Sequence, residues 1–295
     1  MRLARFLGAV GRTLITAGLL ILLFVAYQLW GTGIREAQAQ DRLEDDFTEV
    51  LEEAVSEPAT TATTVPGDPA TVPTVPPAVE GDPTARLRIP TIGVDKIVVE
   101  GVSLADLKKG PGHYPESPLP GQEGNAAIAG HRTTYGAPFH RIDELEAGDE
   151  IIVETIQGSF TYEFTEQLIV SPSQVDVLAD KADNRLTLTA CHPKYSARQR
   201  IVVVAHLVAD EQPLPRAPRA ESAPPPPAID HIDGEGAPAL PAILLGVLCA
   251  VLWLVAWLIG RLWRRWPMYA LVFPFFMVSL FFFFEEFSRL LPSNF

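Results

Sequence analysis

Three long stretches without a charged residue restrict the fold of this chain more than any other feature of its sequence. They cover residues 13–34, 236–260 and 266–284 of a chain of 295 residues. Each approaches or exceeds the roughly 20 apolar residues with which a helix crosses a bilayer. We therefore expect one transmembrane helix near the N-terminus and two near the C-terminus. Pro267 and Pro274 predict that the last of them is kinked or re-entrant.

Arginines beside these stretches predict how the chain is oriented. They are, before the first stretch, Arg2, Arg5 and Arg12 and, between the second and the third, Arg261, Arg264 and Arg265. Lys and Arg accumulate on cytoplasmic flanks, so both groups are expected in the cytoplasm. A cleaved signal peptide would begin in a similar way, but the long apolar run, which ends at Leu29-Trp30 without a small-residue cleavage site, favours a retained anchor. We expect a multi-pass protein of the plasma membrane whose soluble part lies on the extracellular face.

Composition divides the rest of the chain into linkers and one soluble domain of ordinary size. The predicted segments are a cytoplasmic N-terminus (1–12), a transmembrane anchor (13–34), an acidic and then Thr/Pro-rich linker (35–83), the soluble domain (84–210), a Pro-rich linker (211–236), a transmembrane helix (237–260), a cytoplasmic Arg-rich turn (261–266), a transmembrane helix (267–284) and an external tail (285–295). Pro-rich linkers are extended spacers without a core. In the acidic part, Leu43, Phe47, Val50 and Leu51 have helical spacing, which is compatible with a short helix as well as with a solvated coil.

Net charge and cysteine content exclude several kinds of partner and site. The formal net charge of −13 argues against nucleic acid, because binding phosphates needs a basic surface. Cys249 falls in the second apolar stretch, so Cys191 has no intramolecular disulfide partner and is a candidate reactive thiol. The scattered histidines show no metal-ligand spacing, and the acidic residues between 143 and 150 are of the kind that is usually solvated. We therefore expect no metal ion and no cofactor.

The soluble domain is predicted to be all-β, because it consists of many short strand patterns separated by Gly and Pro. Strand patterns occur at 85–102 (interrupted at Pro90 and Gly93), 126–129, 150–155, 159–165, 168–170, 186–189 and 201–204, and short helical turns at 104–109 and 175–179. Residues 110–124, with four Gly and four Pro, are expected to form a loop. The β-branched run from Ile201 to Val204 predicts a strand buried on both faces. Such a pattern is typical of a closed or nearly closed β-barrel.

Cys191 lies at the end of the strand predicted for residues 186–189, just before Pro193. Pro193 has no N–H group for a strand ladder, so the strand is expected to give way to a loop at this point. A residue at the end of a rigid strand is well placed to carry a reactive group. A buried structural cysteine beside an incidental arginine is the alternative.

A cysteine nucleophile needs a nearby base, normally histidine, and a donor for the oxyanion that forms during acyl transfer. The candidate bases in the soluble domain are His113, His131, His140, His192 and His206. His131 follows a short strand that ends in Gly130, which matches the placement of Cys191 at a strand end. His192 is adjacent to Cys191, but neighbouring side chains of a strand point to opposite faces.

Three motifs occur in the order Ala127-Ile-Ala-Gly-His131-Arg, Thr187-Leu-Thr-Ala-Cys191-His-Pro and Arg200-Ile-Val-Val. Together they resemble the signature of the sortases, the cell-wall cysteine transpeptidases of Gram-positive bacteria, over about residues 87–208. The loop Gly112-His-Tyr-Pro-Glu-Ser-Pro-Leu-Pro-Gly121 and the residues from Cys191 to Arg200 look most like the class E members of actinobacteria.

The resemblance implies an eight-stranded sortase-type β-barrel with three catalytic residues in one groove. It implies that Cys191 attacks the Thr carbonyl of a Leu-Pro-x-Thr-Gly-like (LPxTG) sorting signal, or of the Leu-Ala-x-Thr-Gly (LAxTG) form associated with class E. His131 would protonate the departing glycine amine and deprotonate the incoming one, and Arg200 would hold the substrate backbone and stabilise the oxyanion. The implied partners are secreted proteins with such C-terminal signals, an amine acceptor on a peptidoglycan precursor or a pilin, and membrane lipid.

The residues beside the catalytic ones are candidates for substrate binding, namely Thr189, Ala190 and Arg198. Arg198 has the same strand parity as Arg200 and is the second candidate for the arginine role. Sortases usually have Thr before the cysteine, so Ala190 lacks a hydroxyl there and substrate contacts or rate are expected to differ. This departure leaves one alternative open, a barrel retained as a non-catalytic binding module. A cysteine hydrolase with water as the acceptor is a further alternative within the enzyme class.

Overall fold

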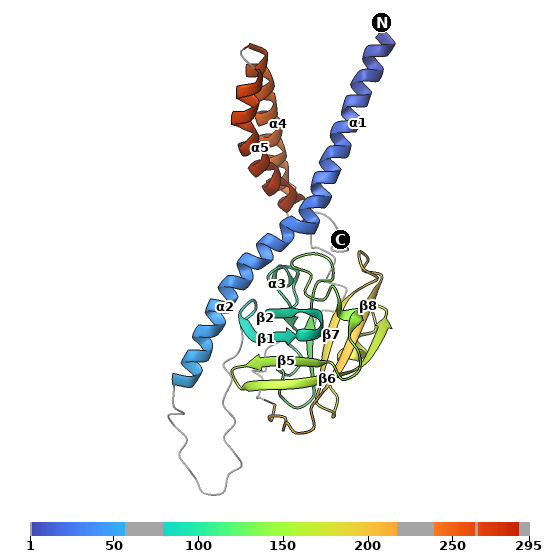
Figure 1. Ribbon diagram of the computed structural model, residues 1–295, viewed down its shortest axis with the longest axis vertical. Helices are drawn as coiled ribbons and strands as arrows, with labels where there is room; N and C mark the ends of the chain where they lie inside the picture. Colours follow the sequence, from blue (N-terminus) through green and yellow to red (C-terminus); the bar gives the residue numbers. More distant parts are fainter. Residues whose placement is uncertain (1, 57–78, 217–238, 263–264, 289–295) are drawn as a thin grey trace. The chain divides into compact units, whose positions relative to one another are not determined.

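The computed structural model of the chain describes residues 2–56, 79–216, 239–262 and 265–288 (Figure 1). The described residues form two compact units, one of residues 2–31, 239–262 and 265–288, the other of residues 32–56 and 79–216. Most of the predicted Thr/Pro-rich part of the first linker, most of the second linker and the end of the predicted external tail lie outside the described residues.

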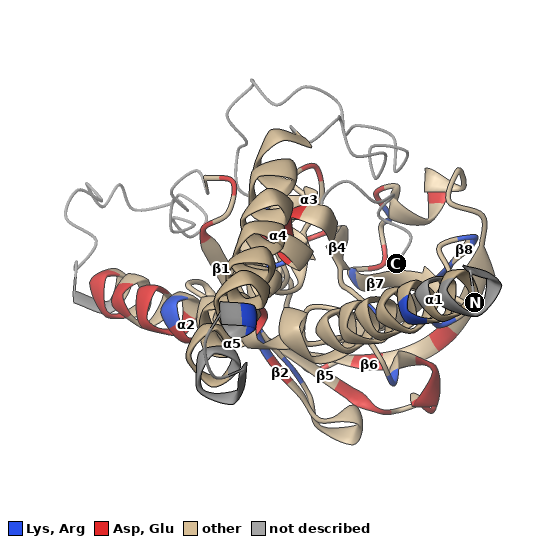
Figure 2. Ribbon diagram, turned by 90° about the horizontal axis from the view of Figure 1, so that it is seen from above, with Lys and Arg blue, Asp and Glu red and all other residues tan. Residues whose placement is uncertain are grey.

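The first unit is helical in its described part. It contains α1 (Arg2–Ala26), the π-helical turn η1 (Tyr27–Gly31), α4 (Ala239–Leu262) and α5 (Arg265–Ser288). Three helical stretches of the described chain, which include α1, α4 and α5, are long and apolar enough to cross a membrane. In Figure 2 these helices are tan over most of their length, because they carry few charged residues. The three predicted apolar helices are therefore present, and Pro274 lies inside α5 without ending it.

Contacts within this unit define the direction of its helices. Cys249 Sγ donates to Ser279 Oγ at 3.3 Å, and Gly246 faces the ring of Phe283, so α4 and α5 form an antiparallel pair. The C-terminal ends of α1 and α5 meet in an aromatic cluster. Its closest ring pairs are Phe24–Phe284, with centroids 5.3 Å apart, and Tyr27–Phe281, at 5.1 Å. Both helices therefore end on the same side of the unit (Figure 1).

The second unit is a closed barrel of eight strands with one long helix. The strands are β1 (Pro83–Ile89), β2 (Val94–Glu100), β3 (Gly112–His113), β4 (Asn125–Ala129), β5 (Glu150–Thr155), β6 (Gly158–Val170), β7 (Arg185–His192) and β8 (Gln199–Leu207). Their order around the barrel is β1-β2-β3-β4-β7-β8-β6-β5. β4 and β7 are parallel neighbours, as are β2 and β3, whereas β7 and β8 are antiparallel. The predicted eight-stranded β-barrel is confirmed.

Apolar residues from every side of the barrel fill its interior. Leu87, Ile128, Tyr162, Leu188 and Ile201 are among the fully buried side chains of this core. Such burial removes apolar surface from water, which is the main stabilising contribution to folding.

β8 is buried on both faces, as its β-branched sequence predicts. Ile201 and Val203 point into the barrel core, whereas Val202 and Val204 lie in a second cluster on the outside with Val170. Val177 of the 3₁₀ turn η4 (Val175–Leu178) covers that outer cluster.

Two local elements differ from the sequence-based prediction. β6 is one strand of 13 residues that bends at a register shift between Phe164 and Glu166, where two separate strands are expected. β3 is a strand of 2 residues inside the expected loop. Its Gly-rich surroundings have no strand pattern, and its pairing with β2 and β4 holds it in the extended conformation. The short helix α3 (Leu104–Leu107) and the turns η2 (Pro90–Ile92) and η3 (Ile142–Glu144) complete the connections.

The acidic stretch after the first apolar segment forms α2 (Thr32–Ser56), a helix of 25 residues. The sequence is compatible with a helix and with a solvated coil, and the folded chain has the helix. Leu43 and Phe47 are buried against Ile97 and Val99 of β2. The acidic residues of α2 stand out in red in Figure 2. The helix is therefore packed on the barrel through one face.

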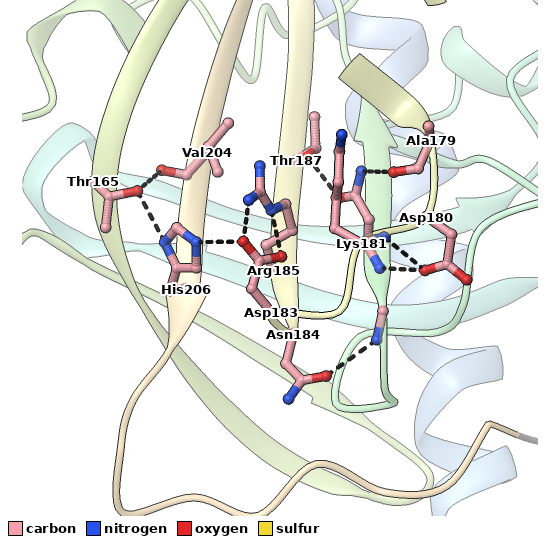
Figure 3. Close-up of polar contacts among 12 residues, drawn as sticks. Thr165, Ala179, Asp180, Lys181, Asp183, Asn184, Arg185, Thr187, Val204 and His206 are labelled. Atoms are coloured by element: carbon pink, nitrogen blue, oxygen red, sulfur yellow. Dashed lines mark hydrogen bonds and ion pairs between the residues drawn. The ribbon is translucent and has the colours of Figure 1, made fainter. Parts of the chain in front are cut away.

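Buried Asn125 at the start of β4 holds the loop between β6 and β7 against the barrel. Its Nδ2 donates to the carbonyl oxygens of Val177 at 3.1 Å and Ala179 at 3.0 Å, and its Oδ1 accepts from Thr187 Oγ1 at 2.6 Å. Asp180 Oδ1 accepts from the N–H of Asn125 at 3.2 Å. Ala179, Asp180 and Thr187 are labelled in Figure 3. These bonds fix η4, which lies over the outer face of β8.

Candidate active site

Strand register brings His131, Cys191 and Arg200 into one row. In the parallel pair β4–β7, Ala129 is opposite Thr189, and the N–H of Gly130 donates to the Thr189 carbonyl at 3.0 Å. His131 and Cys191 are each two residues beyond that pair. In the antiparallel pair β7–β8, Cys191 is directly opposite Arg200. The three residues, separated by up to 69 positions of sequence, therefore lie at or just beyond the same end of three neighbouring strands.

Cys191 is a free, partly exposed thiol near the end of β7. β7 ends at His192, directly before Pro193, as the sequence predicts. The side chains of Thr187, Thr189 and Cys191 alternate with those of Leu186, Leu188 and Ala190, which lie in the barrel core. Cys191 therefore points away from the core, where a substrate can reach it.

Arg200 is 9% exposed, and its Nη1 donates to the carbonyl oxygens of Ala197 at 2.9 Å and Gln199 at 3.1 Å. These two bonds fix the guanidinium group at the beginning of β8. Arg200 lines a shallow hollow, whose other lining residues are Tyr114, Val170, Ser171, Gln174, Val177, Leu178, Thr189 and Val202. The hollow thus lies between β7, β8 and η4.

Tyr114 is a residue of this hollow that the sequence-based prediction misses. Its hydroxyl lies 3.3 Å from Thr189 Oγ1. Burial raises the pKa of Tyr114, whereas its hydrogen bond to Thr189 and the positive charge of Arg200 act in the opposite direction. A tyrosine directly after the two-residue strand β3 has no periodic pattern that would mark it, so only its position in the sortase-like loop motif could have drawn attention to it.

His131 is the base candidate that the register places beside Cys191. Its Nε2 is shielded from solvent and has no hydrogen-bond partner among the described residues. The ring lies 5.1 Å from that of Tyr135, centroid to centroid. Burial, together with the positive charge of Lys108, lowers the pKa of His131 to about 4. A neutral imidazole with an unpaired nitrogen can accept a proton from a thiol.

Several known proteins are similar to this chain in sequence. Sortase SrtE1 of Streptomyces coelicolor is 35% identical over 226 residues, which are 70% of this chain and 58% of that protein. Sortase SrtE2 of the same organism is 32% identical over 228 residues, or 71% of this chain and 85% of that protein. The family model described as "Sortase domain" matches residues 87–208. This chain belongs to the sortase family.

Solved sortase structures are also similar to this chain. Sortase E1 from Streptomyces coelicolor, crystallised with a tripeptide in the active site, is 35% identical with a TM-score of 0.41, over 43% of this chain and 89% of that one. Sortase homologues are cysteine transpeptidases, and relatives in Streptomyces agree with the predicted likeness to the actinobacterial class.

Two predicted substrate-binding residues of this sortase lie outside the hollow. Ala190 is 4% exposed and packs in the barrel core, because its side chain alternates with that of Cys191. The hydroxyl that Ala190 lacks would therefore point to the core and not to the thiol. Arg198 is exposed and precedes β8, so strand parity does not relate it to Arg200. Thr189, in contrast, lines the hollow.

Arg132, the neighbour of His131, connects the segment that carries His131 to the segment that carries Cys191. It is 2% exposed, and its Nη1 donates to the Cys191 carbonyl at 3.4 Å and to His192 Nδ1 at 3.0 Å. Its Nη2 lies 2.7 Å from Asp143 Oδ2. Hydrogen bonds of a buried guanidinium group to a carboxylate are strong and directional. Arg132 therefore ties the loop after β4 to the end of β7.

The other histidines of the sortase domain have structural partners. His113 is buried, with Nδ1 2.8 Å from Glu100 Oε2 and Nε2 3.0 Å from the Pro118 carbonyl oxygen. His206 is opposite Arg185, at the other end of β7 and β8 from Cys191, and its Nε2 lies 3.1 Å from Asp183 Oδ2 (Figure 3). His140 Nδ1 donates to the carbonyl oxygen of Arg132 at 2.9 Å.

Acidic residues near η3 are bound to neighbouring protein groups. Asp143 pairs with Arg132 and Lys194, Glu144 pairs with Arg141, and Asp149 accepts a hydrogen bond from Thr91. Among residues 2–56, 79–216, 239–262 and 265–288, no three His, Cys, Asp or Glu side chains are grouped as they would be to hold a metal ion.

The shifted pKa of His131 predicts how pH changes the stability of the sortase barrel. Between pH 6.5 and about 4 the unfolded chain binds a proton at this position that the folded chain does not bind. The free energy of unfolding therefore decreases as the pH falls through this range, by about 3 kcal/mol at most, and does not depend on this group above pH 6.5. Hydrogen exchange of the backbone amides of β8, measured by mass spectrometry on the full chain across this pH range, reports this decrease in the free energy of unfolding.

His131→Gln is the matched variant for this measurement, because glutamine does not titrate. The free energy of opening of β8 is expected to vary less with pH in His131→Gln than in the natural chain between pH 4 and 6.5. Equal pH slopes in the two proteins would contradict the assigned pKa shift.

Proposed function

We propose that this chain is a membrane-anchored cysteine transpeptidase of the sortase type. It cleaves an LAxTG- or LPxTG-like sorting signal between Thr and Gly through a Cys191 thioester. It then transfers the acyl group to an amine of the cell wall or of a pilin. The observation that supports this proposal most is the strand register: Cys191 is directly opposite Arg200, which lines the hollow, and His131 follows the strand that pairs with that of Cys191. Its substrates are secreted proteins with such a C-terminal signal.

The acylation step needs a base, a nucleophile and a donor for the oxyanion. Cys191 passes its thiol proton to neutral His131, and the thiolate sulfur attacks the Thr carbonyl carbon of the signal. Negative charge then develops on the carbonyl oxygen, and the guanidinium group of Arg200 stabilises it. When the Thr–Gly bond breaks, the imidazolium of His131 gives its proton to the glycine amine, and the acyl group stays on Cys191 as a thioester.

The transfer step repeats these roles in reverse. An acceptor amine attacks the thioester carbonyl while His131 removes one of its protons, and Arg200 again stabilises the oxyanion. The new amide bond forms, the Cys191 sulfur leaves, and the proton on His131 returns to it. Thr189 and Tyr114 line the hollow beside this site and are the proposed contacts of the bound peptide.

Helix direction supports the proposed topology. α1 and α5 end on the same side of their unit, and α4 runs antiparallel to α5. Chain segments that follow α1 and α5 are therefore extracellular if the arginines in the N-terminal half of α1 (Arg2, Arg5 and Arg12) and those at the end of α4 and the start of α5 (Arg261 and Arg265) are cytoplasmic. In this arrangement residues 84–210 form the catalytic domain outside the plasma membrane, and residues 211–236 lead back to it.

An amine-transfer assay tests the proposed reaction. The full chain in lipid nanodiscs is incubated with a Leu-Ala-x-Thr-Gly peptide, with and without diglycine, and the products are identified by mass spectrometry. A ligated product that forms only with diglycine is the expected result. If the peptide is cleaved to the free acid and diglycine does not change this product, the protein is instead a hydrolase. Binding without cleavage of this peptide and of its Leu-Pro-x-Thr-Gly form would identify a binding module.

A further inference from the structure

One face of α2 makes a continuous set of contacts with the barrel and its loops. Thr32, Glu36 and Gln40 are spaced by four residues and therefore lie on the same side of the helix. Thr32 is 1% and Glu36 2% exposed, although both side chains are polar. Leu43 and Phe47 continue this face as its apolar part. Buried polar side chains on a juxtamembrane helix need partners, and each of the three has one on the barrel unit.

Gln40 anchors the middle of the helix to the edge of β2. Its Nε2 donates to the carbonyl oxygens of Ile97 and Lys109, both at 2.9 Å, and its Oε1 accepts from the N–H of Ile97 at 2.8 Å. The amide thereby satisfies both backbone groups of Ile97, as a further strand would. A Cβ atom on Gly110 would lie only 2.3 Å from Gln40 Nε2, so this contact requires glycine there.

The first turn of α2 contacts the loop that follows His131. Thr32 Oγ1 accepts from the N–H of Tyr135 at 3.2 Å. The Glu36 carboxylate pairs with Lys96 at 2.6 Å and packs on Gly136, where a Cβ atom would lie 2.3 Å from Oε2. The helix therefore touches the loop at two successive residues.

This loop has an unusual backbone. Tyr135, Gly136 and Ala137 have φ values of 50°, 71° and 44°, so three residues in sequence are left-handed. Such a conformation costs about 1–3 kcal/mol for each residue other than glycine and persists only where the surroundings enforce it. The two contacts from α2 fall on Tyr135 and Gly136, within this turn.

Tyr135 links the turn to the catalytic site. The centroid of its ring lies 5.1 Å from that of the His131 ring and 5.6 Å from Lys108 Nζ, so the ring is close to both groups. His131 Nε2 has no hydrogen-bond partner among the described residues, which leaves ring packing to orient the imidazole. A change in the position of Tyr135 would therefore change the orientation of His131 and its exposure to water.

We propose that α2 is a positioning element for His131: through Thr32, Glu36 and Gln40 it fixes the left-handed turn whose Tyr135 ring orients the imidazole. The helix does not touch the reacting atoms and acts only through this turn. Its kinetic consequence rests on the proposed transpeptidase function, whereas its effect on the His131 ring does not. The helix that begins at Thr32 thus belongs to the working unit of the barrel, and a protein cut at residue 84 would lack it.

Titration of the His131 ring tests this proposal without need for catalysis. The full chain with ¹³C-labelled histidine is placed in nanodiscs, and the His131 ring signal is identified by its loss in His131→Gln. Thr32→Val removes the hydroxyl but keeps the side-chain shape, and Gln40→Ala removes the anchor on β2. Both variants are expected to raise the pKa of His131 by about one unit, because water reaches a less tightly packed ring.

Matched controls are available on the same helix. Thr48 and Gln38 are exposed, and the hydroxyl of Thr48 bonds only to Glu44 of its own helix. Thr48→Val and Gln38→Ala are expected to leave the His131 titration unchanged. In the diglycine-transfer assay, Thr32→Val and Gln40→Ala are expected to lower kcat about tenfold with little change in KM, because misplaced catalytic groups slow the chemical step.

The outcomes separate this proposal from the proposed function. If the natural chain transfers nothing but the His131 titration moves in Thr32→Val and Gln40→Ala, positioning is correct and the transpeptidase function is wrong. If both variants unfold at a lower temperature while the His131 titration stays that of the natural chain, α2 only stabilises the barrel and the proposal is overturned.

Discussion

Replacement of Cys191 by alanine is expected to abolish thioester formation and peptide cleavage, while the barrel still folds. Alanine removes the nucleophilic sulfur, and no other thiol lies in the described part of the barrel unit. Because the Cys191 side chain points out of the core, its removal leaves no core cavity. Intact-mass spectrometry of the full chain with a Leu-Ala-x-Thr-Gly peptide measures the result. The natural chain should gain the mass of the acyl fragment and lose it in hydroxylamine.

Cys249→Ala provides the matched control for this experiment. Cys249 is the second free cysteine, buried in α4, where its thiol bonds to Ser279. Its replacement is expected to leave the adduct and the turnover as in the natural chain. An acyl adduct on Cys191→Ala would sink the assignment of the nucleophile. Loss of the adduct in Cys249→Ala with an intact barrel would do the same.

Strand positions around the site could be predicted because their pattern is local. Alternation before Cys191, the stop at Pro193 and the β-branched run after Arg200 each depend on neighbours in sequence, and β7 and β8 occur where these patterns place them. The same patterns did not predict how the strands pair. The parallel register of β4 and β7, which aligns His131 with Cys191, depends on residues 60 positions apart.

Sequence alone did not predict the direction of two side chains that were candidates for substrate binding. Ala190 is adjacent to the nucleophile in sequence, yet the alternation of β7 turns its methyl group into the core. Arg198 is two residues from Arg200, but the strand begins only at Gln199. Both residues are close in sequence to a catalytic candidate. The pleat of β7 determines where the Ala190 side chain points, and the start of β8 determines that Arg198 lies outside the strand.

α2 shows a second limit of sequence analysis. Its acidic, amphipathic sequence is compatible with both helix and coil, and propensity alone does not distinguish them. Burial of Leu43 and Phe47 against β2 stabilises the helix, and that contact is visible only in the folded chain. Tyr114 was missed for a related reason, because its neighbour Thr189 is 75 residues away in sequence.

Arg200→Gln is expected to lower kcat/KM for amine transfer by about 10² to 10³-fold, the usual loss when an oxyanion donor is removed. Arg200 is held beside the hollow by its bonds to Ala197 and Gln199, directly opposite Cys191. Glutamine keeps polarity but removes the positive charge. If Arg200 acts on the oxyanion alone, kcat decreases and KM stays the same. If it also holds the substrate backbone, KM rises as well. Rates with a Leu-Ala-x-Thr-Gly peptide and diglycine distinguish the two.

Arg198→Gln is the matched control, since it makes the same substitution two residues earlier. Arg198 is exposed and lies outside β8, so its replacement is expected to change kcat/KM by less than about twofold, as surface charges contribute little. Arg200→Lys tests geometry separately from charge, because an ammonium group cannot reproduce the planar fork of a guanidinium. It should fall between the natural chain and Arg200→Gln. A large loss in Arg198→Gln together with a small one in Arg200→Gln would move the arginine role to Arg198, and the strand register would then not be what selects the catalytic arginine.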